Sequence, residues 1–183
     1  MDLEIRPARD GPVHRGIARF GALALPCALG RAGIATHKRE GDGATPAGGF
    51  PVRRLLYRPD REAPPHGALP AAPIGRDDGW CDDPDDPRYN RPVRLPYAAR
   101  HESLWRADGW YDLVLVIGHN DEPVVPGFGS AVFVHVMRPD GGPTESCVAF
   151  AIEDLRQLVA RLGPASRVVV HASAAAQRLT TTA

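Results

Sequence analysis

Lysine is almost missing from this sequence: of its 22 basic residues, only Lys38 is not an arginine. The acidic residues also number 22, so the formal net charge is zero. Because the chain has neither a net positive charge nor a basic cluster, it does not favour nucleic acid or an anionic membrane surface as a partner. We predict no nucleic-acid ligand and interpret the arginine bias as a compositional habit.

Long apolar runs are missing as well. No stretch approaches the about 20 apolar residues that cross a bilayer, so we predict no membrane span. Residues 17–29 are interrupted by Arg19, Gly21 and Pro26 and do not form the apolar segment of a signal peptide. We predict a first strand there instead, because turn formers flank β-permissive residues.

Cysteine is scarce, and metal and nucleotide motifs are missing. The three cysteines, Cys27, Cys81 and Cys147, lack Cys-x-x-Cys spacing, which argues against a structural zinc site. In an oxidising compartment Cys27 could pair with Cys81 and leave Cys147 as a free thiol. The glycines of residues 30–50 match neither a dinucleotide fingerprint nor a P-loop. The acidic residues within 77–87 do not follow the order of an EF-hand calcium loop.

Glycine and proline, in contrast, are abundant, with 19 of each. They predict many turns and a mainly β, loop-rich fold, and the length suits a single domain over residues 1–183 with a flexible tail at 172–183. Apolar residues three and four positions apart predict one main helix over 152–162, which Gly163 and Pro164 end. The segments predicted as further strands are 50–57, 111–117, 130–136 and 167–171.

Residues 133–150 contain the strongest candidate site. His135 ends a β-branched and aromatic run, a Gly-Gly-Pro turn follows, and Cys147 opens a second apolar run. A thiol attacks only as the thiolate, so a neighbouring base such as His135 would make Cys147 a nucleophile. Backbone N–H groups near Ser146 and Cys147 could bind an oxyanion. The alternative is that Cys147 is a small core residue, since free cysteine is usually buried.

Three further features are candidates for substrate binding. His119 follows the predicted strand 111–117 and is a second catalytic or binding group, or else a hydrogen-bonded structural histidine. Arg39, next to Lys38, could clamp a carboxylate, or both cations are simply solvated. The irregular insertion at residues 58–104 suits a lid or binding wall. We expect Trp80, Tyr89 and Asn90 within it, and Trp105 directly after it, to shape the substrate groove.

Residues 127–150, from Gly-Phe-Gly-Ser to Cys-Val-Ala-Phe, resemble the catalytic motif of the L,D-transpeptidase (YkuD-like) family. In that family a histidine on a strand meets a cysteine in a Ser/Thr-x-Gly-Cys-Val/Ile turn, and His135 and Cys147 match the two. Residues 40–50 are similar to the family's Thr-Pro-x-Gly-x-Phe element, and residues 111–120 resemble the strand that enters its site. The resemblance covers about residues 28–170.

The resemblance implies a fold and an activity. The fold would be a β-sandwich with one main helix and long loop insertions. The activity would be that of a peptidoglycan L,D-transpeptidase, which forms an acyl-enzyme on Cys147 from a stem tetrapeptide. The products would be a 3-3 cross-link or a D-amino-acid exchange, in cell-wall biogenesis that maintains bacterial cell shape. Carbapenem β-lactams would acylate the thiol, and no metal or organic cofactor would be required.

The resemblance also implies a periplasmic or cell-envelope location, whereas no signal peptide is visible, so a cytoplasmic location stays open. Two other functions stay open too: a cysteine amidase or carboxypeptidase on peptidoglycan peptides, and a catalytically weak wall-binding module. The chain departs from the family at two positions. Ser146 replaces the glycine before the cysteine, which would cost about 1 to 3 kcal/mol if that position needs a positive φ. No arginine follows Cys147 to hold a substrate carboxylate.

Overall fold

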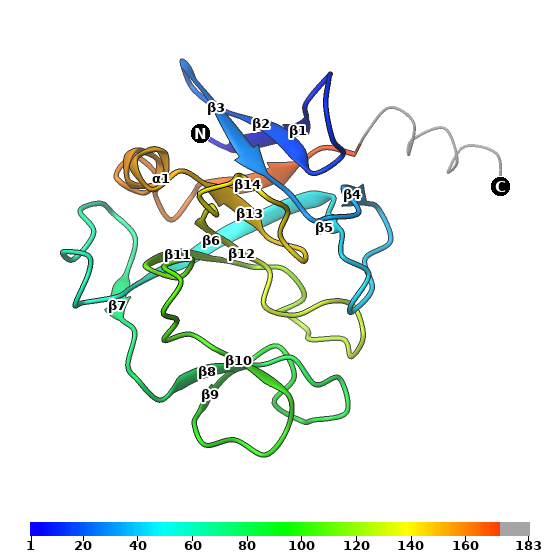
Figure 1. Ribbon diagram of the computed structural model, residues 1–183, viewed down its shortest axis with the longest axis vertical. Helices are drawn as coiled ribbons and strands as arrows, with labels where there is room; N and C mark the ends of the chain where they lie inside the picture. Colours follow the sequence, from blue (N-terminus) through cyan, green and yellow to red (C-terminus); the bar gives the residue numbers. More distant parts are fainter. Residues whose placement is uncertain (173–183) are drawn as a thin grey trace, which may run out of the picture.

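The computed structural model describes residues 1–172, so the predicted tail, apart from Ala172, lies outside the described residues. The chain is mainly β with one helix among these residues (Figure 1). In chain order the elements are β1 (Leu3–Pro7), β2 (Arg15–Phe20), β3 (Leu23–Ala28), β4 (Ile34–Ala35), β5 (Thr45–Pro46), β6 (Gly48–Tyr57), β7 (Ala71–Pro73), β8 (Asp78–Cys81), β9 (Pro92–Arg94), β10 (His101–Ser103), β11 (Leu113–Ile117), β12 (Phe133–Val136), β13 (Val148–Phe150), α1 (Ile152–Val159) and β14 (Arg167–Val170).

The main sheet closes into a barrel. Its nine strands follow the order β11-β12-β13-β3-β2-β1-β14-β6-β7, and β11 also pairs with β6. The long strand β6 makes this closure possible, because its first residues pair with β14 and residues 52–57 pair with β11. The prediction of a two-sheet sandwich was therefore wrong in this respect. Pairings so distant in sequence leave no local pattern from which barrel and sandwich can be distinguished.

Side chains of β11 and β12 alternate between two apolar clusters, as the pleat requires. On β12, Val134 packs into the barrel interior, whereas Phe133 faces an outer cluster with Trp80 of the inserted segment. The helix α1 adds Leu155 and Leu158 to the interior cluster. Strand β11 is buried on both faces, which explains why residues 111–117 are almost continuously apolar.

The amino-terminal region contains more strands than predicted. Residues 17–29 form not one strand but most of the β2–β3 hairpin, whose turn contains Gly21 with a φ of +58°. Strand β1 precedes it, and Leu3 and Ile5 are its fully buried residues. The helix is shorter than the predicted 152–162, because it ends at Val159.

The two cysteines outside the candidate site do not form the disulfide that the sequence left open. Cys27 is a free thiol in the barrel interior, and Cys81 is a free thiol in the inserted sheet. Burial raises the pKa of the Cys27 thiol to about 12, so this side chain acts as a small core hydrophobe. The sequence alone left this pairing open, because the number of cysteines does not determine the distance between two Cα atoms.

The insertion between β7 and β11 is more regular than predicted, since it contains a small sheet in the order β10-β8-β9 (Figure 1). The Trp80 ring packs edge-on against Phe133 with centroids 5.0 Å apart, and its Nε1 donates to Asn90 Oδ1 at 2.9 Å. The Asn90 amide in turn donates to the carbonyls of His119 and Asn120. These contacts attach the insertion to the outer face of the barrel.

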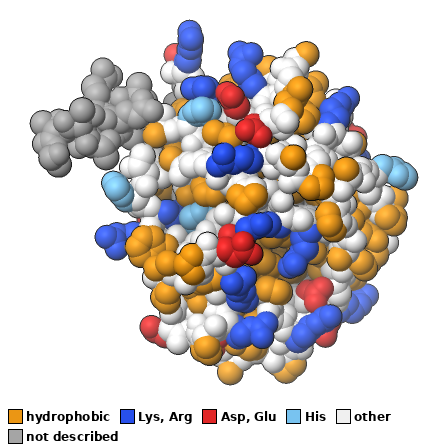
Figure 2. Space-filling view, turned by 180° about the vertical axis from the view of Figure 1, so that it is seen from behind, with side chains coloured by type: hydrophobic (Ala, Val, Ile, Leu, Met, Phe, Trp, Pro, Cys, Tyr) orange, Lys and Arg blue, Asp and Glu red, His pale blue; other side chains and the backbone are white. Residues whose placement is uncertain are grey.

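The molecular surface mixes charges of both signs. Figure 2 shows basic and acidic side chains next to one another across one face rather than in a single-sign field. Many arginines form ion pairs with carboxylates that lie close in space, for example Arg53 with Asp121 at 2.9 Å and Arg94 with Asp77 at 2.7 Å. No helix among residues 1–172 has the length and apolar character that crossing a membrane requires.

Candidate active site

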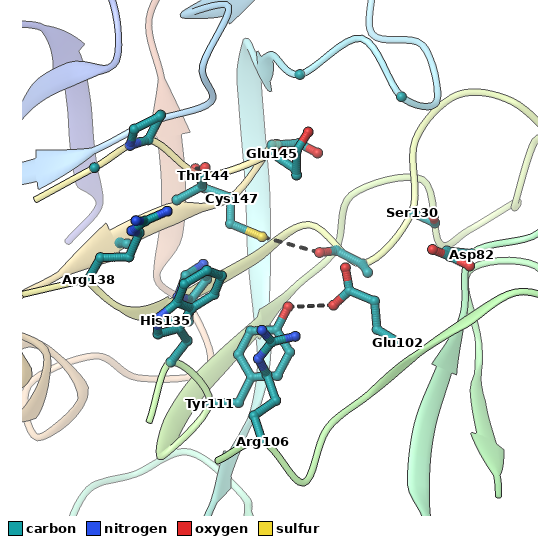
Figure 3. A pocket seen from close by; sticks show the side chains of 18 of the residues that line it. Asp82, Glu102, Arg106, Tyr111, Ser130, His135, Arg138, Thr144, Glu145 and Cys147 are labelled. Atoms are coloured by element: carbon teal, nitrogen blue, oxygen red, sulfur yellow. Dashed lines mark hydrogen bonds between the residues drawn. The ribbon is translucent and has the colours of Figure 1, made fainter. Parts of the chain in front are cut away.

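Cys147 lies on the outer face of the barrel, beneath the insertion. Strands β12 and β13 pair in parallel with Val134 opposite Val148, so the preceding residues, Phe133 and Cys147, are also neighbours. The Phe133 N–H donates to Cys147 Sγ at 3.3 Å, and the thiol donates to the carbonyl of Ala131 at 3.3 Å (Figure 3). The sulfur is thereby held between two backbone groups.

Cys147 is protonated in this arrangement. Burial raises the pKa of its thiol to about 12, and the negative charge of Glu102 acts in the same direction. The hydrogen bond from the Phe133 N–H opposes the shift but does not cancel it. The resting site therefore holds a thiol and not a thiolate.

His135 lies two residues beyond Phe133 on β12, and so on the same face as Cys147. Its Nδ1 is 2.8 Å from the carbonyl of Val136; a carbonyl only accepts, so the proton of the neutral ring is on Nδ1 and Nε2 carries the lone pair. Burial lowers the pKa of His135 to about 4, which keeps the ring neutral. The Tyr111 ring packs edge-on against it at 5.4 Å.

Cys147 and His135 line one pocket of about 340 Å³ (Figure 3). Strand geometry separates their backbones by about 5 Å across the sheet and about 7 Å along it. Within residues 1–172 no hydrogen bond joins Sγ to the imidazole; the thiol is bonded to Ala131 instead. A rotation of the cysteine side chain is therefore needed before His135 can take its proton.

The turn before Cys147 is held by two threonine hydroxyls. Thr144 Oγ1 and Thr45 Oγ1 donate to the carbonyl of Cys147 at 2.8 Å and 3.1 Å. Thr45 also accepts from the Gly30 N–H at 2.8 Å. This role explains why a Thr-Pro element far upstream accompanies the cysteine turn. Sequence reasoning recognised the element at residues 40–50 but not that its threonine bonds to the cysteine.

Ser146 lines the pocket beside Cys147, and its backbone is unstrained. Among the described residues, only Asn90, Asn120 and Ala131 combine a side chain with a positive φ. The cost considered for a Cβ at position 146 therefore does not arise. Outside the strand pairings of the described residues, the N–H groups of Ser146 and Cys147 donate to no backbone carbonyl, so both stay candidates for binding an oxyanion.

The other walls of the pocket carry charges of both signs. Arg106 and Arg138 lie near the Trp110 ring, with guanidinium carbons 4.8 Å and 5.5 Å from its centroid. Each arginine is paired with an aspartate, Asp108 at 2.5 Å and Asp140 at 3.1 Å. The acidic residues that line the pocket are Glu40, Asp82, Glu102 and Glu145.

Two predicted binding residues lie elsewhere. Arg39 and His119 line a separate pocket of about 500 Å³, which does not include Cys147. His119 Nε2 is 3.0 Å from the carbonyl of Phe128, its ring packs edge-on against Phe50, and burial lowers its pKa. Cys147, His135 and Ser146 thus line one pocket, whereas Arg39 and His119 line another.

The insertion contributes different residues from those predicted. Trp80, Tyr89, Asn90 and Trp105 do not line the pocket of Cys147. The first three are buried, and Trp105 packs against the outer apolar cluster. Glu102 and Arg106 line that pocket instead, and so does Tyr111, two residues before β11. No sequence signal pointed to Glu102, because it lies in an irregular segment without a motif. Tyr111 could have been noticed, since it lies at the edge of a strongly apolar strand.

Residues 17–170 match the family model described as YkuD: L,D-transpeptidase catalytic domain. The chain therefore belongs to the L,D-transpeptidase (YkuD) catalytic-domain family, as its motifs suggested. No curated protein and no solved structure matches the chain.

Proposed function

We propose that this protein is a peptidoglycan L,D-transpeptidase that forms an acyl-enzyme on Cys147 from a stem tetrapeptide. The observation that carries the proposal is that the Cys147 thiol and the neutral His135 imidazole line one pocket together with Ser146. These are the groups that thiol acyl transfer needs: nucleophile, base and oxyanion donors. Family membership supports a peptidoglycan substrate.

The proposed reaction begins when the Cys147 side chain rotates from the Ala131 carbonyl toward His135. His135 Nε2 takes the thiol proton, and the sulfur attacks the carbonyl that precedes the terminal D-alanine. The N–H groups of Ser146 and Cys147 stabilise the oxyanion. The carbon–nitrogen bond then breaks, and His135 returns the proton to the departing D-alanine amine.

The thioester is resolved by an acceptor that attacks its carbonyl, with the sulfur leaving and regaining a proton. An amine of a second stem peptide gives a cross-link, a free D-amino acid gives an exchange, and water gives hydrolysis. Three arginines line the pocket, Arg100, Arg106 and Arg138. We assign the substrate carboxylate to Arg106 and Arg138, because both guanidinium groups lie near the Trp110 ring on one wall. Arg39, in the other pocket, is too poorly placed for this role.

The biological setting of this reaction is also a proposal. Family membership favours action at the cell envelope, where cross-linking of the wall would serve cell-wall biogenesis and cell shape. Carbapenem β-lactams would then be covalent inhibitors, because their strained amide can acylate the same thiol.

A carbapenem also provides the test. Purified protein incubated with a carbapenem should gain the mass of one inhibitor molecule, and Cys147→Ala should gain none. Cys81→Ala removes a thiol outside the pocket and should still be acylated once. An unmodified wild-type protein would contradict the proposal.

A second candidate function is a wall-binding module without catalysis. The observation that favours it is the resting thiol itself, protonated and bonded to Ala131 rather than to His135. This candidate predicts that the tetrapeptide binds but that no thioester forms. Intact mass after incubation with the tetrapeptide separates the two functions, and product masses with and without an amine acceptor separate transfer from hydrolysis.

A further inference from the structure

Asn90 lies in the insertion, between β8 and β9, and is only 4% exposed. Its Oδ1 accepts from the indole N–H of Trp80 at 2.9 Å and from the backbone N–H of Ala131 at 3.1 Å. Its Nδ2 donates to the carbonyl of His119 at 3.0 Å and to that of Asn120 at 2.8 Å. A carboxamide has two donor and two acceptor positions, so this buried side chain uses all of them.

Ala131, one of the residues that Asn90 holds, has a backbone conformation that is rare for alanine. Its φ is +49°, in the left-handed region, where a Cβ crowds the backbone. Glycine enters this region freely, but an alanine stays there only where its surroundings enforce the conformation. The hydrogen bond from the Ala131 N–H to Asn90 Oδ1 does so, because it fixes the direction of the peptide that precedes Ala131.

The carbonyl of Ala131 is the group that holds the Cys147 thiol, at 3.3 Å, as the dashed line at the sulfur in Figure 3 marks. Two hydrogen bonds, one on each side of the Ala131 Cα, therefore connect the Asn90 amide to Sγ. The direction of this carbonyl depends on the dihedral angles at Ala131. If Ala131 relaxed to an ordinary conformation, its carbonyl would turn away from the sulfur.

This carbonyl lowers the reactivity of Cys147 in two ways. A hydrogen bond that the thiol donates stabilises the protonated form, and the same oxygen would repel a thiolate. The sulfur must also leave the carbonyl before its proton can pass to His135. The conformation of Ala131 therefore bears directly on the first step of acylation, and Asn90 is the side chain that restrains this conformation through a hydrogen bond.

We propose that Asn90 is a positioning residue: by holding Ala131 in the left-handed conformation, it keeps the Cys147 thiol in its resting place and sets how readily the thiolate forms. The inference rests on the proposed function, since the place of Sγ matters for the reaction only if Cys147 is the nucleophile. The competing explanation is that Asn90 merely attaches the insertion to the barrel. The experiments below separate these two roles.

The first variant removes the amide without straining the backbone. Asn90 itself has a φ of +54°, so Asn90→Gly suits the local conformation, whereas alanine does not. Iodoacetamide alkylation of Cys147, followed by peptide mass between pH 6 and 10, reports how readily the thiolate forms. We expect Asn90→Gly to react about threefold faster than wild type or more at a given pH, because its thiol has lost an acceptor. Equal rates overturn the inference.

The second variant removes the need for the amide. Ala131→Gly introduces a residue that adopts a positive φ without support, so it should react like wild type. In this background, adding Asn90→Gly should change the rate of alkylation by less than about twofold. A role limited to attaching the insertion predicts the opposite, because glycine at position 131 adds no contact between insertion and barrel. The full acceleration in the double variant overturns the inference.

Cys81 is an internal control in the same digest. It is a buried thiol of β8 whose carbonyl accepts from the Asn90 N–H at 2.9 Å, so it would become reactive if the insertion came loose. Its alkylation should be as slow in Asn90→Gly as in wild type. A parallel acceleration at Cys81 and Cys147 would mean that the insertion has opened, and it overturns the inference.

The matched control variant is Arg91→Ala. The Arg91 guanidinium donates to the carbonyl of Asp121 at 2.8 Å, which is another bond between the insertion and the segment after β11. Its removal leaves the Ala131 N–H bonded to Asn90, so Cys147 should react as in wild type. If Arg91→Ala accelerates alkylation as much as Asn90→Gly does, the attachment of the insertion is responsible and the inference is overturned.

Should Asn90→Gly not fold, Ala131→Val decides the same point. A β-branched side chain disfavours the left-handed region while the Asn90 amide stays in place, so alkylation of Cys147 should again accelerate. A wild-type rate in Ala131→Val then overturns the inference.

Carbapenem acylation connects the inference to the reaction, since Sγ has to leave the same carbonyl. Acylation of Asn90→Gly should accelerate by a factor similar to that of alkylation. Unchanged or slower acylation overturns the inference, while the adduct itself upholds the proposed function. No adduct in any variant overturns the proposed function, and the alkylation rates then judge the positioning of the thiol by themselves.

Discussion

The hydroxyl of Thr45 donates to the carbonyl of Cys147 at 3.1 Å, across 102 positions of the sequence. Thr45 is 1% exposed and also accepts from the Gly30 N–H. One buried hydroxyl thus joins β5 to the turn that carries the candidate nucleophile.

Replacing this hydroxyl should weaken both the fold and the site. Thr45→Val keeps the shape of the side chain but leaves the Gly30 N–H without a partner, so we expect a loss of about 1 to 3 kcal/mol in the free energy of unfolding. Urea denaturation measures the loss. Thr36→Val, at an exposed threonine of the same segment, should change stability by less than about 0.5 kcal/mol. Equal stability of Thr45→Val and wild type would show that the hydroxyl is dispensable.

The close approach of Gly30 to residues 43–45 should not tolerate a side chain. A Cβ at position 30 would lie 2.4 Å from the carbonyl oxygen of Gly43 and 2.8 Å from the Thr45 nitrogen. Because both neighbours are backbone atoms, we expect Gly30→Ala to cost about 2 kcal/mol or more and to slow acylation by a carbapenem. Gly163→Ala is the matched control, since no atom lies within 4 Å of its added Cβ. The midpoint temperature of thermal unfolding should be clearly lower for Gly30→Ala than for Gly163→Ala.

Ser146→Gly tests whether the departure from the family glycine matters. Since Ser146 does not have a positive φ, glycine relieves no strain there. We expect a stability equal to or up to about 1 kcal/mol below that of the wild type, because glycine gains entropy in the unfolded chain. The rate of acylation should change less than about threefold. A variant that reacts far faster would mean that the serine side chain obstructs the substrate.

His135 should make the protein sensitive to acid. Its folded pKa of about 4 lies below the ordinary value of 6.5, so the unfolded chain binds more protons between these two values. The contribution of His135 to the free energy of unfolding is therefore fully present above about pH 6.5. It decreases by about 3 kcal/mol as the pH drops toward 4.

Urea unfolding of wild type and His135→Asn at pH 7.5, 5.5 and 4.5 measures this contribution as a difference, since other groups titrate equally in both proteins. The variant should lose stability less steeply with acid and should not be acylated at any pH. His66→Asn replaces an exposed histidine and should follow the wild type. If the free energies of unfolding of His135→Asn and wild type change equally with pH, the buried His135 ring titrates at its ordinary pKa.

The sequence predicted those features that are local. The periodic apolar residues gave the position of α1 to within three residues of its end, and the β-branched runs located β6, β11, β12 and β14. His135 and Cys147 were chosen because a short turn separates two strands, and β12 and β13 are indeed adjacent. The single-domain assignment over 1–183 stays a prediction.

The features that escaped prediction depend on distant contacts. Closure of the barrel needs β6 to pair with β11 and β14, which lie far apart in the chain. Arg39 lies near the family's Thr-Pro element, yet its side chain turns into another pocket, a direction that composition does not determine. Glu102 matters only because the insertion folds back over β12, and no property of residues 58–104 indicates where they dock.

The bonds from Sγ to Ala131 and Phe133 also bear on the durability of the protein. Peroxide and disulfides react with sulfur mainly in its charged form, and a thiol that keeps its proton is a poor target for them. Cys147, held as a thiol in this way, would resist oxidation to sulfenic acid in an oxidising environment. The two backbone groups that hold the sulfur would therefore also protect it from oxidation between reaction cycles.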